Sequence, residues 1–195
     1  YKRQAIYLLS LPQTPSIIAG VICGICVVVM LPGFMIIQPN NSRVLTFFGR
    51  YAGTVISNGF YWVNPLFLKS TVTLRILNLN IDPIKVNDKV GNPIMIGAVV
   101  VWRIKDTYKA SFDISGNIRE FVQIQSDAAL RQVAGMYAYD TNETIDKVTL
   151  RSDESGEITQ RLEDELNSRL AIAGIEIVEA RINYLAYASE IASVM

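Results

Sequence analysis

The sequence of 195 residues contains no histidine and only two cysteines. Histidine is the commonest general base and the commonest metal ligand, so its absence excludes every Ser-His or Cys-His nucleophile arrangement. Both cysteines, Cys23 and Cys26, lie inside a long apolar stretch, which leaves no disulfide for the rest of the chain. We therefore expect no catalytic residues, no metal site and no cofactor.

An excess of charge of one sign is also missing. Lys and Arg together number 18, Asp and Glu together number 18, and the formal net charge is +0. No basic stripe or acidic tail stands out, so we expect no nucleic-acid partner. Roughly 155 residues remain after the apolar stretch and its flank, which is the size of one domain with its own core.

Charged side chains are absent from Ile17 to Ile37, a run of 21 residues. About 20 apolar residues are needed to cross the hydrocarbon core of a bilayer as a helix. The run therefore predicts a membrane segment at 17–37, with residues 1–16 as its flank. The side chains expected to anchor the chain are Ile17, Val21, Ile25, Val28, Leu31, Phe34 and Ile37.

A full span is favoured over two alternatives. A hairpin that dips into one leaflet, from Ala5 to Ile37, is the second interpretation, because prolines interrupt this stretch. A cleavable signal peptide fits less well, since the uncharged run is long and Pro32-Gly33 is not a small-residue cleavage site. The Lys and Arg residues before the segment are about as few as those after it. The positive-inside rule therefore does not decide which side of the bilayer holds the soluble part.

The remaining residues show strand signals first and helix signals later. Strands are expected at 43–48, 93–104 and 175–184. A hairpin-like region is expected before residues 60–63, and residues 70–81 are expected to be rich in β-structure. The strand at 93–104 is nearly all apolar, as expected for a central strand buried on both faces. Helices are expected at 106–112, 119–137 and 155–173.

The order of these elements predicts an α+β domain over residues 38–187, with helices packed on a mixed or antiparallel sheet. The helix at 155–173 has the clearest pattern, since Ile158, Leu162, Leu166 and Leu170 recur every four residues. Residues 188–195 are expected to begin a long C-terminal helix.

Several segments together resemble a known family. They are Val44–Arg50, Gly59–Leu66, Gly97–Asp106, Ala128–Arg131, Gly174–Ile182 and Leu185–Ala188. Their order and spacing resemble the SPFH (band 7) family of stomatin, prohibitin, flotillin and the bacterial HflK and HflC proteins. The bacterial stomatin- and prohibitin-like members are the most similar.

The resemblance implies a membrane-anchored scaffold and not an enzyme. Family members assemble side by side into rings or cages that organise a membrane microdomain or regulate membrane proteins, such as an ATP-dependent membrane protease. The implied partners are membrane lipid, further copies of the chain or a paralogue, and a membrane protease or an NfeD-like protein. The implied location is a membrane, the cell membrane if the source is bacterial.

Two other functions are weighed against the scaffold. A lipid-binding module of a membrane complex is the main alternative. A membrane-tethered hydrolase with a Ser/Lys pair needs no histidine, but Ser70, Ser111 and Ser126 have no lysine at a recognisable spacing.

Two groups of side chains are candidate contact sites. Aromatic residues favour the bilayer interface, and those expected to touch the membrane surface are Phe47, Phe48, Phe60 and Trp62. Charged residues on one helix face are expected to meet between subunits, where they would set register more than affinity. These residues, which also form i,i+4 pairs, are Glu157, Arg161, Glu165 and Arg169.

Overall fold

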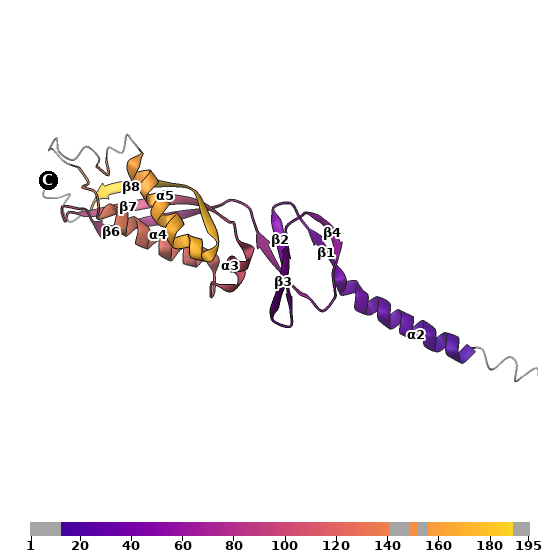
Figure 1. Cartoon of the computed structure of the whole chain (residues 1–195). Coiled ribbons are helices and arrows are strands. Elements are labelled where there is room, and N and C mark those ends of the chain that lie inside the picture. The colour runs from indigo at the N-terminus through magenta and orange to yellow at the C-terminus, as the bar shows by residue number, and fades with distance from the viewer. Residues whose placement is uncertain (1–12, 141–148, 152–155, 189–195) are drawn as a thin grey trace, which may run out of the picture. The chain divides into compact units, whose positions relative to one another are not determined.

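The computed structural model describes residues 13–140, 149–151 and 156–188, with side chains from Ile18 onward (Figure 1). The chain divides into two compact units, residues 1–71 (unit 1) and residues 72–195 (unit 2). The predicted C-terminal helix at 188–195 falls almost entirely outside the described residues.

Unit 1 begins with a helix and continues in short strands. The helix α2 spans Gln13–Met30, and the 3-10 turn η1 spans Leu31–Gly33. The strands are β1 (Phe34–Ile37), β2 (Asn41–Phe47), β3 (Arg50–Val55), β4 (Gly59–Trp62) and β5 (Leu68–Thr73). Strands β1 and β4 pair with each other, and the other three form a sheet in the order β3-β2-β5.

A small core holds unit 1 together. Met35, Ile37 and Leu45 are buried, and Tyr61, Phe67 and other partly buried apolar residues pack against them. The strand pattern explains this arrangement, because alternate residues of a strand point to opposite faces of the sheet.

Gly33 fixes the point where the helix gives way to the sheet. A Cβ atom at this position would lie 2.5 Å from Nε1 of Trp62 and 2.6 Å from the carbonyl oxygen of Val63. Only glycine permits this close approach. The N–H of Val63 donates to the carbonyl of Gly33 over 2.9 Å, and the Trp62 indole N–H donates to the carbonyl of Met30 over 3.2 Å.

These contacts correct the predicted membrane segment at 17–37. The helix ends at Met30, and residues 34–37 form β1, because the Pro32-Gly33 pair stops the helix and β4 offers the next four residues backbone partners. Within the part of the chain that the structure describes, no helix is long and apolar enough to cross a membrane.

Unit 2 is an antiparallel sheet covered by helices. The sheet has the order β6-β7-β8, formed by β6 (Leu77–Asn87), β7 (Pro93–Ile104) and β8 (Ile175–Tyr187). The helices are α3 (Thr107–Phe112), α4 (Ile118–Ala134) and α5 (Glu157–Leu170), and the 3-10 turn η2 (Ala171–Ala173) follows α5. The predicted α+β fold with an antiparallel sheet is therefore confirmed.

The helices pack through the apolar positions that the sequence predicts. Ile158, Leu162, Leu166 and Leu170 of α5 are all at most 1% exposed. On β7, alternate residues from Ile94 to Ile104 are buried, whereas Met95, Val99 and Val101 are only half-buried. The central strand is thus fully covered on one face and partly on the other, which differs from the expected burial on both faces.

The segment 70–81, which is expected to be rich in β-structure, contains parts of two strands with a break between them. Strand β5 ends at Thr73 and β6 begins at Leu77. The backbone N–H of Arg75 donates to the side-chain hydroxyl of Thr73 over 3.3 Å, a local bond that competes with strand pairing. The division between the two units falls beside this break.

Candidate functional site

Helix α2 exposes apolar side chains around its whole circumference. Val21, Ile25 and Val28, three of the predicted anchor residues, have exposed fractions of 58%, 58% and 66%, and Leu31 in η1 has 57%. The side chain of Ile17 is outside the described residues. A helix that is apolar on all sides normally lies in a protein core or in lipid.

The strand pair β1–β4 presents a second apolar surface. Phe34 pairs with Trp62 and Ile36 pairs with Phe60, and all four side chains point to the open face. Their exposed fractions are 47%, 50%, 66% and 67% in that order. The rings of Phe34 and Phe60 stack with centroids 5.3 Å apart. We call these four residues the hairpin face.

The hairpin face changes the predicted anchor set. Phe34 is exposed as expected, but Ile37 is only 3% exposed and belongs to the core of unit 1. The prediction for Ile37 as an anchor was wrong, because in a strand it points to the face opposite that of Ile36. Ile36 was not among the predicted anchor residues. Its spacing of two residues from Phe34 is the pattern that places both side chains on the same face of a strand.

The turn between β2 and β3 carries two more of the predicted residues. Phe48 is 78% exposed and has a φ angle of +44°, a conformation that bulky residues rarely adopt. Its ring meets that of Phe47 edge to face at 4.7 Å, and Phe47 meets Phe67 at 5.4 Å. The turn therefore holds a large aromatic ring out in the solvent.

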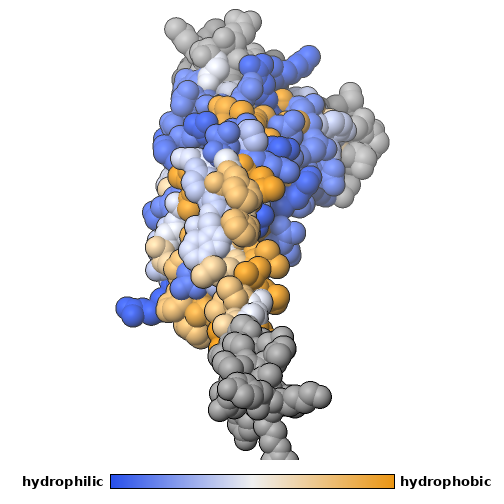
Figure 2. Space-filling view, turned by 90° about the vertical axis from the view of Figure 1, so that its right-hand side faces the viewer, coloured by the Kyte–Doolittle hydropathy of each residue, from blue (hydrophilic) through white to orange (hydrophobic). Residues whose placement is uncertain are grey.

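These surfaces make unit 1 unusually apolar on the outside. In the space-filling view, hydrophobic residues (orange) gather around α2 and the strands that follow it (Figure 2). Large exposed apolar patches mark contacts with proteins or membranes. The four predicted surface residues, Phe47, Phe48, Phe60 and Trp62, all contribute at least 36% exposed side chains.

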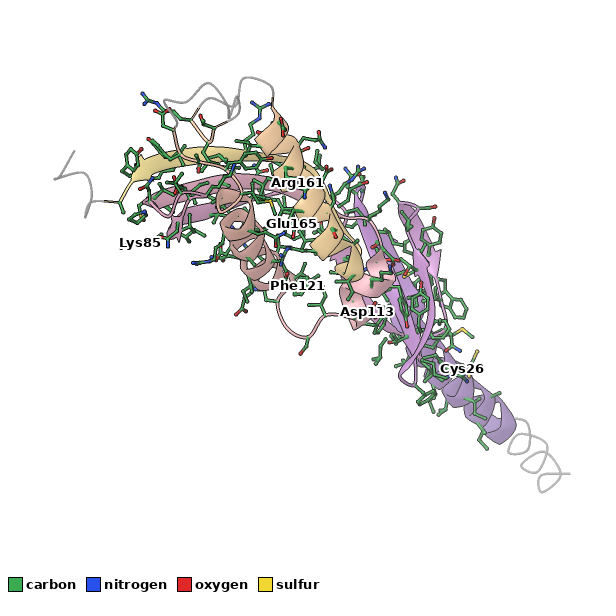
Figure 3. All side chains as sticks on the ribbon, turned by 60° about the vertical axis from the view of Figure 1, so that its left-hand side comes forward. Cys26, Lys85, Asp113, Phe121, Arg161 and Glu165 are labelled. Atoms are coloured by element: carbon green, nitrogen blue, oxygen red, sulfur yellow. The ribbon has the colours of Figure 1, made fainter. Side chains whose placement is uncertain are left out.

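The charged residues of α5 divide into two pairs with different surroundings. Glu165 and Arg169 form the predicted i,i+4 ion pair at 2.7 Å, and Arg169 also donates to the side chain of Gln132 on α4 over 2.7 Å. This pair joins two helices of the same unit. Glu157 and Arg161 are exposed, and among the described residues they make no ion pair. Figure 3 labels Arg161 and Glu165 on this helix.

In the part of the chain that the structure describes, the side chains that could bind a metal ion or act in catalysis have the following surroundings. Among the described residues, no group of three His, Cys, Asp or Glu side chains could hold a metal ion. The Ser111 hydroxyl donates to the carbonyl of Thr107 over 2.7 Å, and Ser126 is 0% exposed, out of reach of a substrate. The pKa of the Asp127 carboxyl is raised, mainly because burial disfavours its charged form. The positive charge of Arg131 opposes this shift, and the negative charge of Asp82 adds to it.

The chain was compared with known proteins and with models of protein families. No curated protein matches the chain. The family model of the SPFH domain / Band 7 family matches residues 35–195, which is most of the chain. SPFH domains are generally associated with membrane scaffolds and with the organisation of membrane microdomains, and they are generally not enzymes. With its antiparallel sheets, packed helices and exposed apolar surface, this chain belongs to the SPFH domain / Band 7 family.

Proposed function

We propose that this protein is a membrane-attached scaffold that inserts α2 and the hairpin face into lipid. The observation that supports the proposal is the exposed apolar surface of unit 1, which includes five side chains of α2 and η1 that are 57–66% exposed: Val21, Ile22, Ile25, Val28 and Leu31. Burial of such side chains is worth about 1.5–3 kcal/mol each when it is complete. Transfer of this surface from water to hydrocarbon is thus the main driving force for attachment.

Trp62 lies at the right place to anchor the hairpin face. Tryptophan favours the boundary between hydrocarbon and water, because its ring is apolar and its N–H is polar. Here the ring is half exposed, while the N–H is satisfied by the carbonyl of Met30 at the end of α2. Attachment through α2 brings this ring to the bilayer surface.

The scaffold acts by assembly. We propose that several copies, or copies that alternate with a paralogue, pack side by side into a ring or cage. Glu157 and Arg161 are suited to this contact, since both are exposed and have no ion-pair partner among the described residues. The proposed role of the assembly is to enclose a patch of membrane and to regulate its proteins, with a membrane protease or an NfeD-like protein as partner.

A lipid-binding module is the second candidate function. It is favoured by a groove in unit 1 that has cationic and apolar side chains in its lining. The two functions differ in the mass of the particle that they predict. A scaffold extracted in mild detergent forms closed particles of many copies, which single-particle imaging detects. A monodisperse monomer that retains lipid contradicts the scaffold and supports the module.

Membrane contact has a direct test in the two tryptophans. Trp62 is 50% exposed on the hairpin face, and Trp102 is 2% exposed in the core of unit 2. The Trp102→Phe variant keeps only Trp62, and the Trp62→Phe variant keeps only Trp102 as a matched control. With vesicles of neutral phosphatidylcholine brominated on the acyl chains, we expect quenching of Trp62 fluorescence and none of Trp102. Equal quenching of both, or of neither, contradicts insertion of the hairpin face.

A further inference from the structure

The charges of the chain are separated by unit, although they sum to zero. Residues 1–71 contain five Lys or Arg residues and no Asp or Glu, so all 18 acidic residues lie in residues 72–195. Within the described part of unit 1, the cations are Arg43, Arg50 and Lys69. A single-sign surface attracts ligands of the opposite charge. The unit that carries the exposed apolar surface is therefore also the unit that attracts anions.

Two of these cations line one groove of about 570 Å³. Arg43 lies on β2 and Lys69 on the neighbouring strand β5. Asn41 is two residues before Arg43, and Thr71 is two residues after Lys69, so each strand places a polar partner on the same face as its cation. The polar side of the groove thus offers cationic and hydroxyl or amide groups, and no carboxylate lines it.

Within the part of the chain that the structure describes, neither cation has an opposite charge beside it. Arg43 is half-buried, and among the described residues its guanidinium makes no hydrogen bond or ion pair. Lys69 is also half-buried, and its ammonium donates to the backbone carbonyl of Pro32. Both side chains are thus only partly open to water, and an anion in the groove would give each cation an opposite charge to bind.

The groove also has an apolar part to its lining. Phe34, Ile36 and Phe60 of the hairpin face line it together with the polar residues of β2 and β5. A free phosphate ion would use only the cationic side. An amphiphile with an anionic head group and a hydrocarbon tail would use both sides, since a guanidinium holds phosphate through two parallel hydrogen bonds and the rings pack against an acyl chain.

We infer that this groove binds the head group of an anionic phospholipid, with Arg43 and Lys69 on the phosphate and the hairpin face along the upper part of an acyl chain. The inference rests on the proposed membrane contact and adds selection among lipids to it. The scaffold would then gather anionic lipid around each subunit and not only attach to the bilayer.

The test measures selectivity between two vesicle compositions with the full chain. Partition into phosphatidylcholine vesicles is compared with partition into the same vesicles containing phosphatidylglycerol. For Arg43→Gln, we expect the preference for anionic vesicles to fall about fivefold. Arg50→Gln is the matched control, because it removes the same charge from the same unit at an exposed position outside the groove.

Salt separates a bound lipid from general attraction to a charged surface. At about 1 M salt the Debye length is about 3 Å, so long-range attraction is screened. Under these conditions we expect Arg43→Gln to keep its effect and Arg50→Gln to have none, while Arg43→Lys restores part of the preference. Equal losses in the two glutamine variants overturn the inference in favour of a bulk charge effect.

Two further measurements identify the source of the phosphate and the state of the fold. A lipid that also contacts the apolar lining of the groove should bind more tightly than its soluble head group, so glycerol phosphate at the same concentration as the accessible phosphatidylglycerol should not displace the vesicles. Displacement at equal concentration indicates a site for free phosphate and overturns the inference. Circular dichroism confirms that Arg43→Gln is folded. Partition into neutral vesicles tests the proposed membrane contact separately. If the protein does not bind neutral vesicles, the proposed contact through the apolar surface is wrong, whatever the groove binds.

Discussion

The backbone N–H of Ala180 donates a hydrogen bond to the carboxylate of Glu163 over 3.0 Å, so a helix side chain covers the edge of the sheet. Asn167 accepts from the N–H of Ile177 over 3.0 Å in the same way. Strand β8 is an edge strand, and unpaired edge groups invite pairing with other chains. Helix α5 therefore satisfies part of the edge with its own side chains.

Removal of this cover should destabilise unit 2. Glu163→Ala leaves the Ala180 N–H without its acceptor, and we expect a loss of about 1–2 kcal/mol in the free energy of unfolding. Urea denaturation measures this loss. The control is Asp164→Ala on the exposed side of α5, where we expect a change within about 0.5 kcal/mol. Equal changes in the two variants would show that the bond to Ala180 does not matter.

Gly174 and Gly156 form a matched pair of left-handed glycines, with φ angles of +67° and +68°. A Cβ atom at Gly174 would lie 2.6 Å from the carbonyl oxygen of Asp106, whereas at Gly156 no described atom lies within 4 Å. We expect Gly156→Ala to cost about 1 kcal/mol, the penalty for an ordinary residue in this conformation.

Gly174→Ala should cost more than twice as much, because the clash adds to the same penalty. It would also disturb the N–H groups of Lys105 and Asp106, which both donate to the carbonyl of Gly174 over 2.9 Å. Thermal unfolding of the two variants side by side checks the difference. Similar melting temperatures would mean that the backbone near Asp106 yields easily.

Asp88 should make stability depend on pH. Burial opposes its ionisation, but hydrogen bonds from the backbone N–H groups of Tyr139 and Asn92 and from the Asn92 side chain outweigh burial and lower its pKa. A carboxyl group with a lowered folded pKa stabilises the protein above its unfolded pKa of about 3.9. This stabilisation is lost as the pH falls through the folded pKa.

The matching variant is Asp88→Asn. We expect it to lower the free energy of unfolding by about 2 kcal/mol at neutral pH, since the amide cannot accept the bond from Tyr139 in the same geometry. The difference from the unmodified protein should shrink below about pH 4. Urea midpoints recorded across this range measure the effect, and two parallel curves would exclude Asp88 as the source.

Ile36 and Ile37 are neighbours with opposite surroundings, since they are 66% and 3% exposed. Ile37→Ala should destabilise the fold by roughly 3 kcal/mol, because it removes packing from the core of unit 1. Ile36→Ala should leave stability almost unchanged and should weaken binding to neutral vesicles several-fold. Denaturation and vesicle sedimentation together separate the two. If Ile36→Ala binds normally, the hairpin face does not enter lipid.

The sequence predicts best the elements that depend on local periodicity. The four apolar side chains from Ile158 to Leu170 are buried as their spacing indicates, because an amphipathic helix needs only its own pattern and one surface to cover. The N-cap at Asn117 is also local, and its side chain accepts from the N–H of Arg119 over 2.9 Å.

Elements that depend on a distant partner could not be predicted in the same way. Residues 34–37 are as apolar as the helix before them, and only the pairing of β1 with β4 makes them a strand. The groove also depends on residues that are far apart in the sequence. Arg43 and Lys69 are 26 residues apart, and the order β3-β2-β5 is what places them on neighbouring strands. The separation of charge between residues 1–71 and 72–195 can be counted from the sequence, but the net charge of +0 alone does not reveal it.

The absence of Asp, Glu and His from residues 1–71 also determines what can regulate attachment. Without a carboxylate among these residues, unit 1 attracts an anionic surface and has no negative side chain to repel one. If the proposed head-group site exists, ions that screen this attraction and the share of acidic lipid in the bilayer would determine how strongly the unit binds.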